Sequence, residues 1–213
     1  ARPRLTPAER RAVFLLVGLL PVLAIGSVGN QQIFNAYMLW VPSNVSLVFF
    51  GRTMPTTWLI TLDSVVSISC LVAAVAFWRV WAKRFKEPSE VVKIALGLGC
   101  SAVALLCLAA AALASTADHK ASVGWVLGFE LLNSIGFANV FPVGLAMYAR
   151  ASPKPLVGTI VGVYLLHLFL GNNLVGWLGG LLDHMAGTSF WLMHAALVGA
   201  AGATMLIAAR FAG

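Results

Sequence analysis

Two carboxylates lie inside long apolar runs of this sequence. Of its seven acidic residues, Asp63 occurs in the run WLITLDSVVSIS and Glu130 in the run WVLGFELLNSIGF. A carboxylate is costly in the hydrocarbon of a membrane, so such residues usually face the interior of a helix bundle or a water-filled cavity. Both are therefore candidates for binding a proton or a cationic solute. The alternative is a carboxylate near the membrane surface that is partly hydrated or, for Asp63, paired with Arg52.

Further polar residues share the helix faces of these two carboxylates. Ser67 follows Asp63 by four residues, and Asn133 and Ser134 follow Glu130 by three and four. Residues at these spacings are neighbours on one face of an α-helix. Each carboxylate is thus expected to belong to a polar stripe along its own helix.

The stretch GNQQIFNAY places several amides deep in another apolar run. They are Asn30, Gln31, Gln32 and Asn35. An amide without a partner in lipid costs several kcal/mol, so this face is expected to meet protein or water. Two interpretations stay open: hydrogen bonding between helices, or a face that lines the path of a solute.

A third polar group is formed by Tyr164 and His167, which share a helix face at a spacing of three. His167 either changes protonation near neutral pH or is a neutral core residue with a hydrogen bond. The sequence has no nucleophile motif, no metal-ligand spacing and no phosphate-binding glycine loop after a strand. We expect no catalytic residue, no metal, no cofactor and no enzymatic activity.

The elements that must position these residues are transmembrane helices. The chain of 213 residues is 60% hydrophobic and 10% charged, against about 25% charged in soluble domains. We predict an all-α integral membrane protein with a short N-terminal segment, 1–11, and a six-helix transmembrane domain, 12–210. The predicted spans are about 12–42, 56–82, 91–115, 123–148, 156–182 and 189–210.

The distribution of positive charge predicts the orientation of these spans. Of the 14 Lys and Arg residues, all but Arg52 and Lys120 fall on one side of the predicted membrane. Cytoplasmic loops carry such an excess, so both termini are expected in the cytoplasm. The net charge of +7 is then a signal of topology. We expect membrane lipid around the chain and no nucleic acid as a partner.

The whole chain resembles the C-terminal half of the proton-dependent oligopeptide transporter family, a branch of the major facilitator superfamily. The resemblance is carried by several stretches: LTPAERR at 5–11, WLITLDSVVSI at 58–68, KRFKEPSEVVKIALGLG at 83–99, and Trp125 followed by NSIGF at 133–137 and PVGLAMYARASPKPLVGTIVGVYLL at 142–166. It implies half of a major-facilitator-type bundle in the inner membrane of a bacterium, and proton-coupled uptake of small peptides or a related solute.

The sequence departs from the family pattern at several positions of the implied site. The family's helix-ten glutamate, linked to proton coupling and to the peptide amino terminus, falls on Phe137, and its helix-eight asparagine falls on Asp63. A helix-seven carboxylate falls on Asn30, with Gln31 as the glutamine that follows it. The helix-eleven tryptophan that lines the site falls on Tyr164. Our hypothesis is that the negative charge of the site has moved to Asp63.

The expected function depends on what completes the bundle, because this superfamily places its substrate between two six-helix halves. Three partners stay open: a second six-helix half, a homodimer mate, or a larger membrane complex. With one of the first two, the chain forms half of a peptide-transporter-like secondary transporter. The alternative is a transport-inactive accessory or structural subunit of a larger complex.

Overall fold

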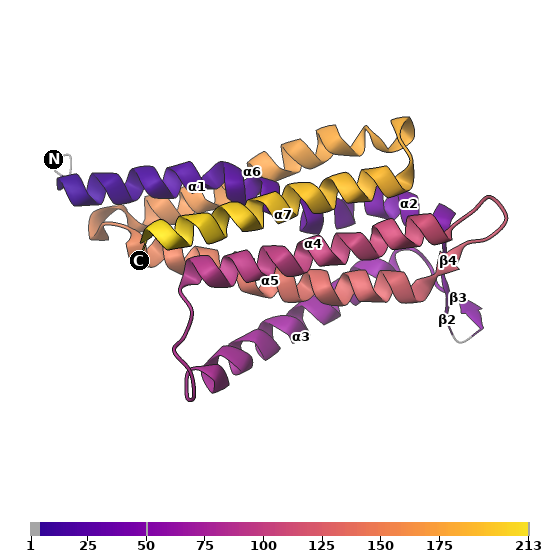
Figure 1. The fold of residues 1–213 in the computed structure, drawn as a ribbon, viewed down its shortest axis with the longest axis horizontal. Helices are drawn as coiled ribbons and strands as arrows, with labels where there is room; N and C mark the ends of the chain where they lie inside the picture. Colours follow the sequence, from indigo (N-terminus) through magenta and orange to yellow (C-terminus); the bar gives the residue numbers. More distant parts are fainter. Residues whose placement is uncertain (1–4, 50, 213) are drawn as a thin grey trace.

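The computed structural model describes residues 5–49 and 51–212 (Figure 1). Six long helices dominate it: α1 (Pro7–Gln31), α3 (Trp58–Trp81), α4 (Glu90–Ala114), α5 (Val123–Ala151), α6 (Val157–Gly179) and α7 (Gly187–Ala212). The shorter elements are helix α2 (Ala36–Asn44), the 3-10 turns η1 (Gln32–Phe34), η2 (Lys154–Leu156) and η3 (Leu182–His184), and the strands β1 (Val45–Ser46), β2 (Val48–Phe49), β3 (Arg52–Thr53) and β4 (Ala121–Ser122).

The chain is a six-helix membrane bundle. Within the described residues, six helices are long and apolar enough to cross a membrane. Each of the last five predicted spans corresponds to one helix, from α3 to α7. The first helix starts earlier than the predicted boundary at residue 12, because Thr6 and Glu9 form a reciprocal capping box in front of Pro7.

The predicted first span, 12–42, is not one continuous helix. α1 ends at Gln31, η1 follows, and α2 starts after Asn35, whose backbone leaves the helical region with φ −132° and ψ −109°. The side chain of Gln32 stabilises this break, because its Oε1 accepts a hydrogen bond of 3.2 Å from the backbone N–H of Ala36. A side chain thus replaces the carbonyl that a continuous helix would have supplied.

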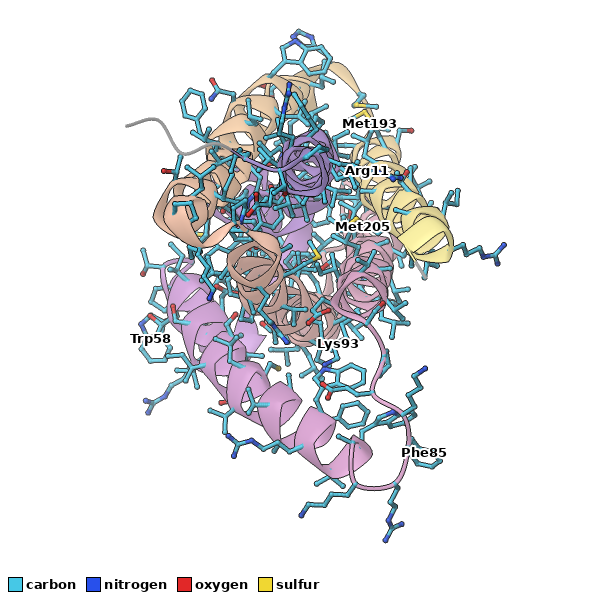
Figure 2. All side chains as sticks on the ribbon, turned by 90° about the vertical axis from the view of Figure 1, so that its left-hand side faces the viewer. Arg11, Trp58, Phe85, Lys93, Met193 and Met205 are labelled. Atoms are coloured by element: carbon cyan, nitrogen blue, oxygen red, sulfur yellow. The ribbon has the colours of Figure 1, made fainter. Side chains whose placement is uncertain are left out.

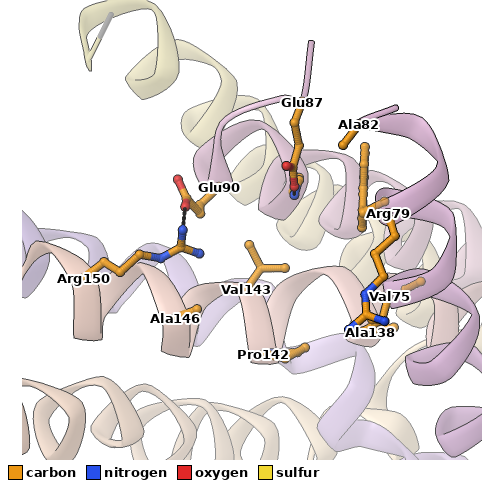
Figure 3. A pocket seen from close by; sticks show the side chains of 13 residues that line it. Val75, Arg79, Ala82, Glu87, Glu90, Ala138, Pro142, Val143, Ala146 and Arg150 are labelled. Carbon is orange, nitrogen blue, oxygen red and sulfur yellow. Dashed lines mark hydrogen bonds and ion pairs between the residues drawn. The ribbon is translucent and has the colours of Figure 1, made fainter. Parts of the chain in front are cut away.

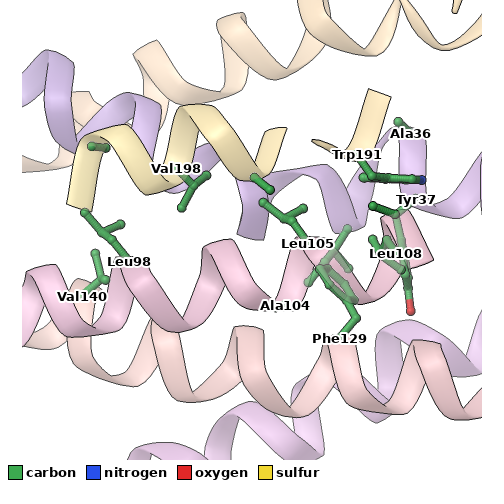
Figure 4. Close-up of a cluster of buried hydrophobic side chains, with 14 of the residues drawn as sticks. Ala36, Tyr37, Leu98, Ala104, Leu105, Leu108, Phe129, Val140, Trp191 and Val198 are labelled. Carbon is green, nitrogen blue, oxygen red and sulfur yellow. The ribbon is translucent and has the colours of Figure 1, made fainter. Parts of the chain in front are cut away.

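The core of the bundle is formed around α4, which lies between α5 and α7 (Figure 1). Leu98, Leu105 and Leu108 of α4 point into a buried apolar cluster with side chains of α5 and α7 (Figure 4). Glycines allow α4 and α5 to approach closely: a Cβ atom on Gly97 would lie 2.8 Å from the carbonyl oxygen of Gly136. This kind of small-residue contact is typical of helix pairs in membranes.

Helix α3 is the least embedded of the six. In the most apolar 18-residue stretch of this helix, 11% of the residues are buried. The helix packs mainly against α5. The loops at the end opposite to the chain termini carry two short ladders (Figure 1). β1 pairs with β4 in parallel, with Val45 opposite Ala121, and β2 with β3 in an antiparallel hairpin. Gly51 in that hairpin has a φ of +74°, which glycine adopts without strain.

Candidate functional site

The two intramembrane carboxylates meet at the contact of α3 with α5. Asp63 is 8% exposed and Glu130 is 1% exposed. The serines one turn beyond each of them, Ser67 and Ser134, have their hydroxyls 3.1 Å apart, which places the two carboxylates on facing sides of α3 and α5. Two carboxylates in one buried site favour a proton on one of them, because two unpaired negative charges there repel. We call Asp63 and Glu130 the acid pair; sequence spacing gave no reason to bring together residues on different helices.

Glu130 has a hydrogen-bond partner that sequence reasoning missed. The hydroxyl of Tyr37, at the start of α2, donates to Glu130 Oε1 at 2.5 Å. Tyr37 is fully buried and its ring packs on Phe129, with the ring centroids 5.1 Å apart. A tyrosine in an apolar run is usually an aromatic residue of the core, so nothing in the neighbouring sequence identified Tyr37 as a partner of Glu130. The break after η1 is what sets α2 in place beside α5.

Serines continue the polar contact between α3 and α5. Ser67 donates to Asp63 Oδ1 at 3.4 Å, and its hydroxyl lies 3.1 Å from that of Ser134. Both serines lie on the faces that the spacing predicted. These residues form a polar cluster between three helices, in which Tyr37 bonds to Glu130 and the two serines link α3 to α5.

Asn133 supplies polar atoms that the protein does not use. The residue is fully buried, and among the described residues neither of its side-chain amide atoms has a hydrogen-bond partner. The same holds for Glu130 Oε2, one helical turn away. Buried polar atoms are normally paired. This cluster thus has the capacity to bind a small polar or charged group in addition to its internal bonds.

The alternative environment, a hydrated carboxylate near the surface, does not describe these residues. Both members of the acid pair are buried. Arg52 lies exposed in the β2–β3 hairpin, and the ion pairs formed by the described residues are Lys93–Glu87 and Arg150–Glu90. No cation in that part of the chain therefore neutralises the pair. A proton on one of the two carboxyl groups is the remaining way to reduce their negative charge.

The amides of the first span take separate roles. Gln32 is fully buried: its Nε2 donates to the carbonyl of Val175 at 3.4 Å and lies 2.9 Å from His194 Nε2. It therefore joins the break in the first span to α6 and α7, which is the helix-joining interpretation. Gln31 is half-buried. Asn35, also half-buried, packs on α6, where a Cβ atom on Gly179 would lie 3.0 Å from its Oδ1.

A second, smaller polar region lies deeper in the bundle. A small cavity of about 20 Å³ lies there, close to the minimum volume that holds one water molecule. Its lining includes Asn30, Phe137 and His167. Phe137 stacks on Phe141 with the ring centroids 5.4 Å apart. His167 is 2% exposed, and its Nδ1 lies 2.5 Å from the carbonyl oxygen of Tyr164. A contact with a carbonyl requires Nδ1 to donate, in line with the hydrogen-bonded core interpretation.

Tyr164 does not line that cavity. It is fully buried, its hydroxyl donates to the carbonyl of Phe141 at 2.8 Å, and its ring lies 4.8 Å from that of Tyr148. Gly144 makes room for it, since a Cβ atom there would lie 2.6 Å from the Tyr164 hydroxyl. Tyr164 joins α5 to α6. Among the described residues no three His, Cys, Asp or Glu side chains gather into a group that could hold a metal.

Comparisons with known proteins agree with one another. The sequence pattern of the POT family matches residues 4–192. The chain is 25% identical to a peptide transporter of Yersinia enterocolitica over 148 residues, which are 68% of this chain and 29% of that protein. It is 34% identical to dipeptide and tripeptide permease A of Chromobacterium violaceum over 89 residues, 42% of this chain and 18% of that protein.

Solved structures show the same fold. A peptide transporter POT in complex with sulfate superimposes with a TM-score of 0.87 at 17% identity, over 98% of this chain and 42% of that one. A POT family transporter in complex with a thioalcohol conjugated peptide gives a TM-score of 0.85 at 16% identity, over 97% of this chain and 43% of that one. The chain therefore spans less than half the length of these relatives, and it belongs to the POT family.

Proposed function

We propose that this chain is the C-terminal six-helix half of a peptide-transporter-like secondary transporter, which takes up small peptides or a related solute together with a partner half. Nearly all of the chain superimposes on well under half of POT transporters. The motifs before α4 and along α5 resemble those of the second half of the family. The transmembrane domain, 12–210, would then have both termini in the cytoplasm, as the distribution of Lys and Arg indicates.

The observation that carries a coupled mechanism is the buried acid pair. Asp63 and Glu130 are both buried, and the side-chain amide atoms of Asn133, one turn from Glu130, have no partner in the described part of the chain. Two carboxyl groups in one buried site do not readily carry two charges, so one of them would hold a proton. A cationic group of a solute that entered this cluster could displace that proton, because both would compensate the same negative charge. Binding and proton release would thereby be coupled at one place.

In this proposal the deeper cavity plays a different part. Phe137 stands where the family resemblance expects a glutamate, and its ring stacks on Phe141. The wall around Asn30 and His167 is therefore more apolar than the resemblance implies. We propose that this region contacts the apolar part of the solute, while the acid pair, about 10 Å further along α5, senses its charge.

The test uses the assembly extracted from its own membrane in mild detergent. Native mass spectrometry gives its composition, and proteoliposomes made from it are assayed for uptake of labelled dialanine under an imposed proton gradient. We expect gradient-driven accumulation by the wild type and a loss of at least about tenfold in Asp63→Asn. Asp118→Asn, which removes an exposed carboxylate from a loop, is the matched control and should transport like the wild type.

One observation favours a second candidate, a transport-inactive accessory subunit. In the described helices no Lys or Arg lies in the middle of a span, and Phe137 replaces the coupling glutamate that the resemblance implies. A complex with unrelated subunits, whose reconstituted form takes up neither dialanine nor other small peptides at any gradient, would overturn transport and support this alternative. A second six-helix half, or a dimer of this chain, would support transport.

A further inference from the structure

An open groove runs along α3 on the side that faces α5. Two adjoining pockets form it, and both include Ala74 and Trp78. The first has a volume of about 400 Å³ and is lined almost entirely by apolar side chains, among them Ala73, Phe77 and Ile135. The second, of about 480 Å³, contains charged side chains. We call the two together the α3–α5 groove.

The groove exists because α3 stands apart from the rest of the bundle. Figure 2 shows α3 set off from the other helices, between the labelled residues Trp58 and Phe85. Its main packing is against α5, and few of its residues are buried. Among the described residues, the side of α3 that borders this groove is therefore open to another apolar molecule.

The polar atoms of the apolar part are already paired. Trp78 Nε1 donates to Asn139 Oδ1 at 2.8 Å, and Asn139 Nδ2 donates to the carbonyl of Ile135 at 2.9 Å. Asn139 is the polar side chain that lines this part. The Trp78 N–H and both ends of the Asn139 amide thus already have a partner within the protein, and the rest of the surface is apolar, which suits a hydrocarbon chain.

The other part of the groove has an excess of positive charge. Lys93 pairs with Glu87 and lies 4.6 Å above the ring of Trp78, and Arg150 pairs with Glu90 at 3.0 Å. In Figure 3 the side chain of Arg79 extends from α3 toward α5. Among the described residues Arg79 forms no ion pair. The opposite charges within each of the two ion pairs cancel. The remaining charge of Arg79 makes this part of the groove positive.

The two parts are arranged like the two parts of a lipid. Arg79 lies in the last turn of α3, where an apolar span reaches the level of the headgroups, and the apolar part lies toward the middle of the helix. Anionic headgroups attract basic residues at this level. A phosphate beside Arg79 would thus place an acyl chain along Ala74 and Phe77.

We propose that the α3–α5 groove binds an anionic phospholipid, with the phosphate at Arg79 and one acyl chain between α3 and α5. This site is separate from the acid pair and does not depend on transport. The lipid would support α3, which the protein itself holds mainly through α5.

The first test is native mass spectrometry of the purified assembly with phosphatidylglycerol and with phosphatidylcholine of the same acyl chains. We expect the wild type to bind phosphatidylglycerol about fivefold more tightly, and Arg79→Gln to lose most of that preference. Arg84→Gln removes a nearby exposed cation that does not line the groove, and should keep it. Ala73→Trp fills the apolar part at an exposed position, and should weaken both lipids.

Several results would overturn the proposal. Equal binding of the two lipids by the wild type, or equal effects of the two arginine variants, would remove the role of Arg79. Displacement of the lipid by inorganic phosphate would mean that the groove binds a free anion. A photoreactive benzoylphenylalanine at Phe77, activated in intact membranes, should crosslink to lipid; a crosslink to a protein chain would show that another helix covers the groove.

Discussion

The hydroxyl of Tyr37 is predicted to stabilise the bundle through Glu130 alone. It donates at 2.5 Å to Glu130 Oε1, and both residues are at most 1% exposed. In the described part of the chain Glu130 Oε2 has no hydrogen-bond partner. Tyr37→Phe would therefore remove the one tyrosine donor of a buried carboxyl group while leaving the shape of the side chain intact.

The expected cost follows from the burial of both partners. A buried acceptor that loses its donor destabilises a protein by about 1–3 kcal/mol. For a chain of this size about 1 kcal/mol shifts the melting temperature by roughly 2–4 °C. We expect Tyr37→Phe to lower the melting temperature in detergent by about 2–12 °C, measured from intrinsic tryptophan fluorescence.

A double-mutant cycle isolates the contact. In a Glu130→Leu background the Tyr37 hydroxyl has already lost its acceptor, so Tyr37→Phe should then cost little or raise stability. We expect a coupling energy of about 1–2 kcal/mol, within the range for directly bonded residues.

Tyr148→Phe is the matched control for this cycle. Its hydroxyl is equally buried but donates to the backbone carbonyl of Leu16 at 2.6 Å. It should cost a similar amount, and its effect should be the same with Glu130 or with leucine at position 130. If Tyr37→Phe were also additive with Glu130→Leu, to within about 0.5 kcal/mol, the reasoning about the hydrogen bond from Tyr37 to Glu130 would be refuted.

Two further substitutions test the packing. Gly136→Ala would bring its Cβ to 2.7 Å from the carbonyl oxygen of Gly97, so we expect a loss of about 1–3 kcal/mol in thermal unfolding. Gly128→Ala on the same helix meets nothing closer than 3.7 Å and should melt near the wild type; equal melting of both variants would contradict a tight α4–α5 crossing. Gln32→Ala should cost about 1–3 kcal/mol because it unpairs buried groups of three helices, whereas Gln31→Ala should cost clearly less.

Helix number and the polar residues that merit study could be predicted from the sequence. Length and hydropathy are properties of each segment alone, and the structure has a helix, from α3 to α7, at each of the last five predicted segments. The stripe formed by Asp63 and Ser67 follows from helical spacing, and that spacing holds in the structure.

The break at Asn35 could not be predicted in the same way. The run from Ala12 to Pro42 is apolar on both sides of its amide-rich middle, and its overall hydropathy indicates one span. What ends the helix is the bond from Ala36 to the side chain of Gln32, which is itself held by α6 and α7. A helix boundary that depends on residues more than 140 positions away leaves no local signal.

By itself, the sequence determined that this chain is a helical membrane protein, which residues lie in its spans, and which of them are too polar to face lipid. These properties follow from the free energy of transferring each segment from water into a membrane, which depends on the composition of that segment and not on the rest of the fold. The tertiary structure decided which polar residues meet. It set Asp63 and Glu130 on facing sides of α3 and α5, gave Glu130 a hydrogen bond from Tyr37, and bonded the Tyr164 hydroxyl to a carbonyl of α5. Contacts between helices depend on how each helix is rotated about its axis and how closely it approaches its neighbour. At the α4–α5 crossing the glycines allow a close approach, and this becomes visible only in the packed structure.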